Sequence, residues 1–216
     1  MGKIAVVPAD PHFVATNPIV ISESKIWKIS AKTANSRQIK VFQWNFLFTR
    51  FAVGYDDGTV RILNNDFSNA YIITTGHHGV SAIEWHPHRY QIVAVGLASG
   101  DVLVYDTGND TGDEQIPAPK ILSFHKSRII CLAWPRQDEM LYLASGAQDS
   151  TVNVYNLIAG TVDAVYREHR SRVLSVAFNP HDINKIYSVG EESAEVHCWF
   201  VSNHPARFGD TVGKIN

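Results

Sequence analysis

One unit of a tight turn followed by a strand recurs along the chain and limits what it can fold into. Its four copies begin at Gly54, Gly96, Gly146 and Gly190 and read GYDDGTVRIL, GLASGDVLVY, GAQDSTVNVY and GEESAEVHCW. Each copy has a glycine, a polar turn and then a run of mostly apolar residues, as a buried or half-buried strand requires. A repeat of about 40–45 residues with four strands is typical of a β-propeller blade. The sequence therefore predicts an all-β propeller.

The copy between Phe124 and Asn156 shows the unit most clearly. Turn residues separate three expected strands at Arg128–Trp134, Met140–Ser145 and Thr151–Tyr155. The short polar turn before the last of these predicts a hairpin.

A large aromatic residue ends the first strand of each copy. These residues are Trp44, Trp85, Trp134 and Phe178. Because each propeller blade needs a large apolar residue against its neighbour, we expect all four in the core.

The repeats predict a propeller over residues 1–200, in about five blade-like units. The units are about 2–36, 37–69, 70–119, 120–163 and 164–200. The first is the least regular, with Trp27 as its expected inward-facing aromatic residue. Residues 201–216 predict a C-terminal tail or a closing strand. Propellers have about four to eight blades, so three alternatives stay open: a closed five-bladed ring, an open one completed by a partner, or part of a larger assembly.

The units resemble WD repeats in the His before the first strand, the Asp of the turn and the aromatic residue near the end of the third strand. In that family a His, a Ser or Thr, an Asp and a Trp form a buried hydrogen-bonded tetrad. The matching residues here are His125, Ser145, Asp149 and Tyr155. The Trp-Asp pair that names the family is absent. Ser99 and Ser193 stand where the turn Asp is expected, so those units should lack the full tetrad.

Residues 80–107, 124–135, 141–146 and 169–200 are also similar to the WD-repeat Gemin family, the RNA-recognising component of the SMN complex. The resemblance implies binding of capped small nuclear RNA and its delivery to Sm-ring assembly. That family has two joined propellers, more than this chain holds, so this chain is expected to be a reduced relative or a fragment.

Charge and composition limit the partners and the compartment. The formal net charge is −2, so an RNA partner needs a local basic patch. The two cysteines, Cys131 and Cys198, lie in different units without CxxC spacing, and we expect buried free thiols. Neither a secretory signal nor an apolar run of about 20 residues is found, so the cytosol or the nucleus is expected, without membrane insertion.

Catalytic chemistry is not indicated. The sequence has no phosphate-binding glycine loop, no GxSxG and no HExxH, so we expect a non-enzymatic protein without a cofactor. The pairs His77-His78 and His86-Pro-His88 lack supporting carboxylate or cysteine ligands, so no metal site is predicted.

The loops that enter the first strands carry the candidate binding residues. They are Lys126 and Arg128 in one unit, and Arg170 and Arg172 at the same offsets in the next. Together with Tyr55, in a turn expected at the same face, they predict a rim that contacts phosphates and stacks a base. The alternative is a solvated rim whose arginines pair with neighbouring glutamates.

Two functions follow. The first is a binding scaffold that recognises small nuclear RNA in SMN-type ribonucleoprotein assembly. The second is a protein-interaction scaffold in a multi-subunit complex, coat-like or nuclear-pore-like, whose propeller a partner chain completes.

Overall fold

The described part of the chain is made of β-strands, turns and connecting segments. The computed structural model describes residues 37–66, 68–76, 78–108, 118–136, 141–192, 195–201 and 213–215. The chain divides into two compact units, Met1–Ser36 and Arg37–Asn216, and every described residue belongs to the second. The predicted unit 2–36, with Trp27, lies outside the described residues. Among the described residues, no helix is long and apolar enough to cross a membrane.

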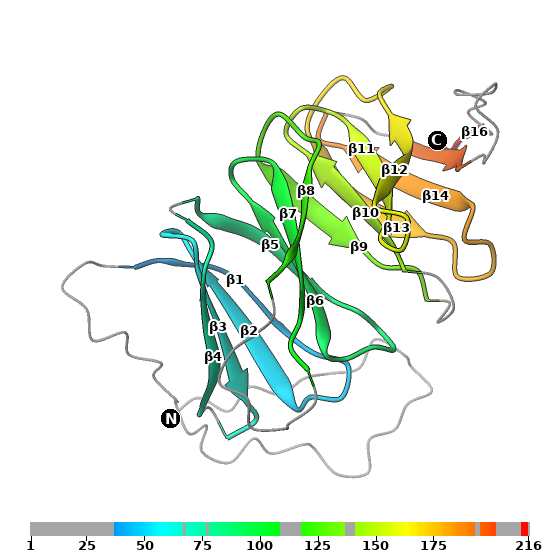
Figure 1. Cartoon of the computed structure of the whole chain (residues 1–216). Coiled ribbons are helices and arrows are strands. Elements are labelled where there is room, and N and C mark those ends of the chain that lie inside the picture. Colours follow the sequence, from blue (N-terminus) through cyan, green and yellow to red (C-terminus); the bar gives the residue numbers. More distant parts are fainter. Residues whose placement is uncertain are drawn as a thin grey trace, which may run out of the picture. The chain divides into compact units, whose positions relative to one another are not determined.

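The described strands form four antiparallel sheets (Figure 1). The first sheet contains β1 (Ile39–Trp44), β2 (Arg50–Tyr55), β3 (Thr59–Asn64) and β4 (Asn69–Thr74). The second contains β5 (Val80–Trp85), β6 (Ile92–Leu97), β7 (Asp101–Asp106) and β8 (Lys120–Ser123). The third contains β9 (Ile129–Ala133), β10 (Tyr142–Ala147), β11 (Val152–Asn156) and β12 (Thr161–Tyr166). The fourth contains β13 (Val173–Phe178), β14 (Lys185–Gly190), β15 (Val196–Phe200) and β16 (Gly213–Ile215).

Within each sheet the strands pair in chain order, so each sheet is an antiparallel meander. This confirms the predicted all-β fold of blade-like units. Extensive contacts between described sheets join only consecutive ones: first to second, second to third and third to fourth.

The third sheet contains the three strands expected between Phe124 and Asn156. Strands β9, β10 and β11 lie within two residues of the predicted ranges, and β10 and β11 form the predicted hairpin. Ser150 adopts a positive φ of 66° in its turn, where the first two sheets have Gly58 and Gly100. Ser150 therefore adopts a left-handed backbone conformation that glycine adopts without strain.

The borders of the predicted units differ from those of the sheets. Residues 70 and 164 fall inside β4 and β12, and residue 120 is the first of β8. The outermost strand pairs with the third strand of its own sheet, so the three predicted units that start at residues 70, 120 and 164 begin on the last strand of the preceding sheet. At the C-terminus, residues 213–215 of the predicted tail or closing strand form β16, which pairs with β15.

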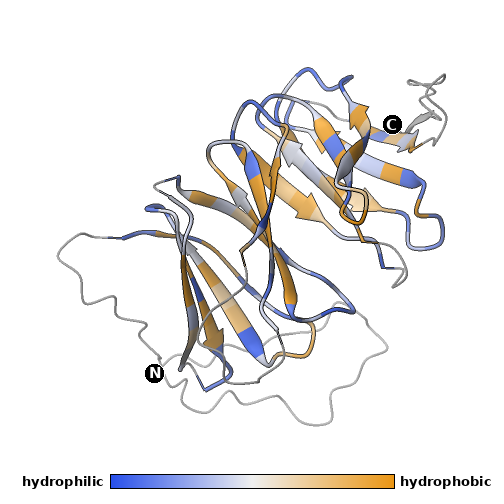
Figure 2. Ribbon diagram, in the orientation of Figure 1, coloured by the Kyte–Doolittle hydropathy of each residue, from blue (hydrophilic) through white to orange (hydrophobic). Residues whose placement is uncertain are grey.

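Consecutive sheets join through a glycine of the second strand. A Cβ atom built on Gly54 would lie 2.4 Å from Val80 Cγ1, and one on Gly96 would lie 2.5 Å from Ile129 Cγ2. Gly146 has the same relation to Val173, at 2.5 Å from its Cγ1. The missing side chain leaves a hollow that the first residue of the next sheet fills. Hydrophobic clusters span these joints, and Figure 2 shows the hydrophobic residues gathered along the strands.

The aromatic residues that end the first strands add a polar contact to two joints. Trp85 Nε1 donates a hydrogen bond to the Gln43 carbonyl at 3.1 Å, and Trp134 Nε1 donates one to the Glu84 carbonyl at 3.0 Å. The fourth sheet has Phe178 at this position, which cannot donate. Trp85, Trp134 and Phe178 are buried, as predicted, whereas Trp44 is only half-buried and packs against Phe48 and Phe51.

The fourth sheet departs from the glycine alignment. The first residue of β13, Val173, pairs with Gly190, whereas the first residue of β9, Ile129, pairs with Ala147. Gly190 is therefore equivalent to Ala147, and Val189 occupies the position that is glycine in the other three sheets. The sequence alignment on Gly190 was wrong by one residue, because this sheet has its glycine at the end of the strand.

We expect Gly96→Ala to lower the free energy of unfolding by about 1–3 kcal/mol, because the added methyl overpacks the joint with Ile129. In an Ile129→Ala background the same change should cost less, since the obstructing Cγ2 atom is gone. Urea unfolding of the four proteins measures this coupling. Ser175→Ala, at an exposed strand position, serves as the control. A cost for Gly96→Ala no larger than for this control contradicts the proposed joint.

Candidate functional site

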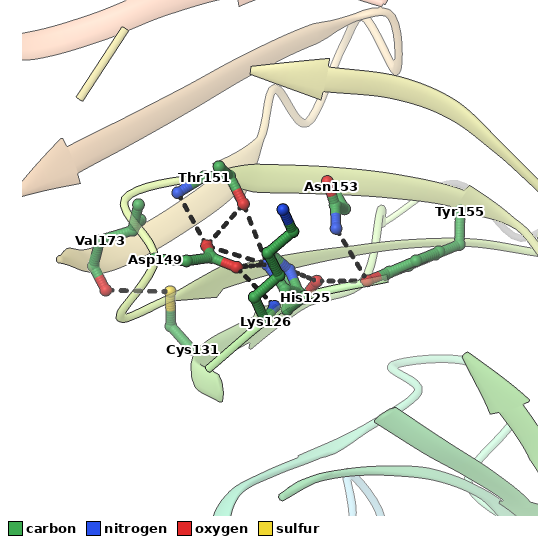
Figure 3. A network of polar contacts seen from close by, with 9 residues as sticks. His125, Lys126, Cys131, Asp149, Thr151, Asn153, Tyr155 and Val173 are labelled. Atoms are coloured by element: carbon green, nitrogen blue, oxygen red, sulfur yellow. Dashed lines mark hydrogen bonds and ion pairs between the residues drawn. The ribbon is translucent and has the colours of Figure 1, made fainter. Parts of the chain in front are cut away.

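The third sheet contains a buried chain of hydrogen bonds. His125 Nε2 lies 2.7 Å from Ser145 Oγ, and Ser145 Oγ donates to the Tyr155 hydroxyl at 3.0 Å. On its other side, His125 Nδ1 lies 3.2 Å from both carboxylate oxygens of Asp149. Figure 3 shows His125 between Asp149 and Tyr155. The structure thus brings together the four residues that the WD resemblance implied.

The carboxylate of Asp149 ties two loops together. It accepts hydrogen bonds from Thr151 N at 3.1 Å and from Thr151 Oγ1 at 2.6 Å, both within its own turn. It also accepts one at 2.9 Å from the backbone N–H of Lys126, in the loop between β8 and β9. The loop that carries the candidate cation Lys126 is therefore held by a buried network, which limits its freedom before any partner binds.

Burial and hydrogen bonding set the charges of this network. Burial lowers the pKa of His125, and the nearby Asp149 opposes this shift only in part. Burial raises the pKa of Asp149, but hydrogen bonds from Thr151 and Lys126 outweigh it, so the pKa lies below its ordinary value. At neutral pH the network therefore holds a neutral imidazole and an ionised carboxylate. This arrangement stabilises a loop and gives no sign of a general base facing solvent.

The fourth sheet has an incomplete version of the same network. His169 Nε2 lies 2.7 Å from Ser188 Oγ, and Trp199 Nε1 donates to the same oxygen at 3.2 Å. His169 Nδ1 is buried and has no hydrogen-bond partner among the described residues. Ser193, expected in place of the turn Asp, lies outside them. Alignment on Gly190 missed Ser188, because Ser145 directly precedes its glycine whereas Ser188 lies two residues before Gly190. A search for a serine at that second position would have found it.

Two imidazoles stack in this part of the fourth sheet. The rings of His169 and His197 lie 4.4 Å apart at an interplanar angle of 9°, and the Tyr166 hydroxyl lies 2.9 Å from His197 Nδ1. Burial, together with His197, lowers the pKa of His169 to about 4. His169 is therefore held neutral at physiological pH.

The four predicted rim cations are exposed at the loops before β9 and β13. The two loops have matching backbone contacts, with Gln148 N donating to the Arg128 carbonyl and Glu191 N to the Arg172 carbonyl. Arg172 also forms an ion pair with Glu191, which neutralises it. In the described part of the chain, Lys126, Arg128 and Arg170 form no ion pair.

Tyr55 does not belong to this rim. Only 2% of it is exposed, so its ring cannot stack a base from solvent. The Arg61 guanidinium lies 6.0 Å from the ring centroid. The prediction placed Tyr55 in a turn, but Tyr55 is the last residue of β2, at the position that Ala147 occupies in the third sheet.

In the histidine pairs considered as metal ligands, His86 stabilises a turn. His86 is buried, and its Nδ1 accepts hydrogen bonds from the N–H groups of His88 and Arg89. His77 lies outside the described residues. Among the residues that the structure describes, no group of three or more His, Cys, Asp or Glu is placed to hold a metal ion.

The hairpin turn between β1 and β2 is a feature that the sequence analysis missed. Its tip, Phe46–Phe48, exposes three large apolar side chains, with exposed fractions of 61%, 55% and 69% for Phe46, Leu47 and Phe48. The buried side chain of Asn45 holds the turn, because its Oδ1 accepts from the N–H groups of Thr49 and Arg50. Three consecutive large apolar residues between two strands were the signal in the sequence.

Two family models match the chain. The Anaphase-promoting complex subunit 4 WD40 domain matches residues 19–87, and the WD domain, G-beta repeat, matches residues 118–156. These matches support the WD-repeat family, and the four blade-like sheets have the WD-repeat β-propeller fold.

Several curated proteins are similar to parts of the chain. Protein SUPPRESSOR OF PHYA-105 1 of Arabidopsis thaliana is 27% identical over 177 residues, which cover 81% of this chain and 16% of that protein. WD repeat-containing protein slp1 of Schizosaccharomyces pombe is 25% identical, covering 78% of this chain and 33% of that protein. Gem-associated protein 5 of Homo sapiens is 31% identical over 141 residues, covering 62% of this chain and 9% of that protein. The chain thus spans a third or less of the length of these relatives.

Among solved structures, a chain of the mitotic checkpoint complex superposes with a TM-score of 0.67 at 21% identity. The match covers 78% of this chain and 49% of that chain, and it shows the fold alone. The Gemin resemblance is one among several WD-repeat likenesses, so the comparisons support the WD-repeat family and go no further.

We expect Asp149→Ala to lower the free energy of unfolding by about 2–4 kcal/mol, because it removes the acceptor of the Lys126 N–H and of both Thr151 donors and leaves His125 Nδ1 with the Thr151 hydroxyl alone. Chemical denaturation measures this loss. Asp106→Ala is the matched control, since its exposed carboxylate accepts only the Gly108 N–H among the described contacts, and it should change stability much less. Equal losses for the two variants would show that Asp149 does not support this loop.

Acid should destabilise the fourth sheet through His169. Its pKa of about 4 in the fold lies below the ordinary value of about 6.5, so the unfolded chain takes up the proton first. The stability linked to this group is present above pH ~6.5 and is lost as the pH falls towards 4. His169→Gln should show a smaller drop in Tm between pH 7 and 4.5 than the wild type, even if it melts lower at pH 7. The exposed His181→Gln serves as control, and parallel Tm profiles for the wild type and His169→Gln contradict this account.

Proposed function

We propose that this chain is a non-enzymatic scaffold that binds protein partners of a multi-subunit complex, and that the hairpin tip Phe46–Phe48 is its principal docking contact. The observation that carries the proposal is the exposure of three consecutive large apolar residues on one fixed turn. Exposed apolar clusters of this kind mark sites of protein association, because their burial in a partner removes apolar surface from water.

The geometry of the turn supports a preformed docking contact. Asn45 Nδ2 donates to Thr49 Oγ1 at 2.9 Å, in addition to the two backbone contacts that its Oδ1 accepts. Phe48 adopts a φ of 55°, a left-handed conformation that few bulky residues accept. Phe48 is therefore kept in a costly conformation with its ring in solvent, a combination that strand pairing alone does not explain.

The name of one similar protein agrees with a scaffold in a larger assembly. It is the 78 kDa dynein intermediate chain of the flagellar outer arm of Chlamydomonas reinhardtii.

The test compares the proteins captured from native cell extract by the wild type and by Phe46→Ser/Leu47→Ser/Phe48→Ser, with quantitative mass spectrometry. We expect specific partners to be reduced at least tenfold by the triple variant. The control is Ile158→Ser, which removes an exposed apolar side chain, 75% exposed, from another turn. Unchanged capture by a correctly folded triple variant would exclude the tip as the docking contact.

A second candidate function is recognition of small nuclear RNA at the rim. It is favoured by the exposed, unneutralised Lys126, Arg128 and Arg170 on two loops of consecutive sheets, and by the likeness to Gem-associated protein 5. Such cations contact phosphates, and their effect weakens with salt. The rim lies at the start of the first strands, whereas the turn Phe46–Phe48 follows the end of one, so a scaffold has room for both contacts.

Binding of a capped RNA with a uridine-rich Sm-type site, compared with a scrambled uncapped RNA at two salt concentrations, tests this candidate. We expect Lys126→Glu/Arg128→Glu to weaken binding at least tenfold. Arg172→Glu should have a smaller effect, because Glu191 already neutralises Arg172. Lys40→Glu/Arg136→Glu, two exposed cations outside the rim loops, makes the same change in net charge and serves as the control. Equal affinity for both RNAs, lost with salt, would leave the protein scaffold alone.

We also propose the cytosol or the nucleus as the location of this scaffold. Both Cys131 and Cys198 are free thiols, and burial raises the pKa of Cys131 to about 12. A thiol with this pKa stays protonated and unreactive, which suits a reducing compartment.

A further inference from the structure

Equivalent residues on the four sheets show what each sheet offers to a following one. In the second sheet, Gly96 and Ala94 of β6 face Ile129 and the rest of the third sheet. The strand registers place Gly54 and Ala52, and Gly146 and Ala144, at the same two positions in the first and third sheets. Each of these sheets therefore has a two-residue hollow made by a glycine and an alanine, and the next sheet inserts a β-branched side chain into it.

The fourth sheet lacks this hollow. Its two equivalent positions on β14 are occupied by Tyr187 and Val189, because Ala177 pairs with Tyr187 and Ser175 with Val189. Asn179 Nδ2 donates to the Tyr187 hydroxyl at 3.3 Å, and Lys185 Nζ lies 5.8 Å from the centre of its ring. The bulky ring is therefore held in place where the other sheets leave space.

The first sheet carries the complementary side chains. Ile39 and Phe42 of β1 stand at the register positions of Val80 and Ile83 in β5, which are buried in the joint between the first and second sheets. Ile39 is 51% exposed and Phe42 is 64% exposed. A second copy of the chain thus offers apolar side chains of the kind that a hollow accepts. A chain with such side chains at one end and a hollow at the other would add copies head to tail.

We propose that Tyr187 and Val189 prevent the first sheet of a second copy from packing on the outward face of the fourth sheet. They thereby prevent head-to-tail association of chains through Ile39 and Phe42. A second copy would have to seat Ile39 where the Val189 side chain stands, at a position where even a Cβ atom would lie within 2.4–2.5 Å of the inserted residue in the other three joints. Contacts this short require displacement of the backbone or loss of the joint. The face accepts only a partner surface that leaves room for Tyr187 and Val189.

The test restores the hollow with Tyr187→Ala/Val189→Gly, which copies Ala94 and Gly96 of the second sheet. Sedimentation velocity over a hundredfold concentration range measures the mass. The variant should gain concentration-dependent association that the wild type lacks. Adding Ile39→Asp/Phe42→Asp to the same chain should abolish the gain. Leu174→Ala, which shortens an exposed side chain of β13, controls for a general change of this face.

Mixing two variants of the chain shows which two faces associate. Wild type offers Ile39 and Phe42 with a closed fourth sheet, and the chain with all four substitutions offers a hollow without those side chains. Each should be a monomer alone, and together they should form a one-to-one complex. Circular dichroism and Tm verify folding, and Val189→Gly alone serves if the double variant does not fold. A folded hollow variant with unchanged mass overturns the proposal. So does wild-type self-association that Ile39→Asp/Phe42→Asp abolishes.

Discussion

The insertion of a β-branched side chain into the space above a glycine holds consecutive sheets together. Val80, Ile129 and Val173 each lie so close to a glycine of the preceding sheet that no side chain fits between them. The strands on both sides can approach because alanine stands next to each glycine along the outward face. Hydrophobic clusters then close around each joint, and the loops before β9 and β13 are brought to equivalent places in neighbouring sheets. The candidate rim exists because these joints repeat.

The His125 network fixes the backbone of the loop before β9. A neutral imidazole and an ionised carboxylate, both largely removed from water, hold the Lys126 backbone while its side chain and that of Arg128 remain in solvent. A buried polar side chain also fixes the turn Phe46–Phe48, at the other end of a first strand. There the buried Asn45 holds the backbone, and the phenylalanine rings face solvent. Buried polar groups thus position two chemically different surfaces, one cationic and one apolar, and both serve a scaffold better than a catalyst.

The repeat made the all-β, blade-like fold predictable, because the period and the turn chemistry are local properties of the sequence. The network of His125, Ser145, Asp149 and Tyr155 was implied by the resemblance to WD repeats. Positions that depend on register were less predictable: alignment on Gly190 concealed Ser188, since a shift of one residue moves a side chain to the other face of a sheet. The burial of Tyr55 depends on neighbours that are distant in sequence, so no local pattern indicated it. The pairing of Arg172 with Glu191 agrees with the alternative that rim arginines pair with neighbouring glutamates.

The succession of joints also determines how the described part of the molecule comes apart. Extensive contacts join only consecutive sheets, so stability is close to a sum of neighbouring terms, as in linear repeat proteins. A sheet with described joints on both sides opens only when two joints break, whereas the first and fourth sheets each lose one. The apolar turn Phe46–Phe48 belongs to the first sheet, so a partner that binds there would stabilise a sheet with a single described joint. By mass action, such binding lowers the population of molecules in which this sheet is open, and local stability then depends on partner concentration.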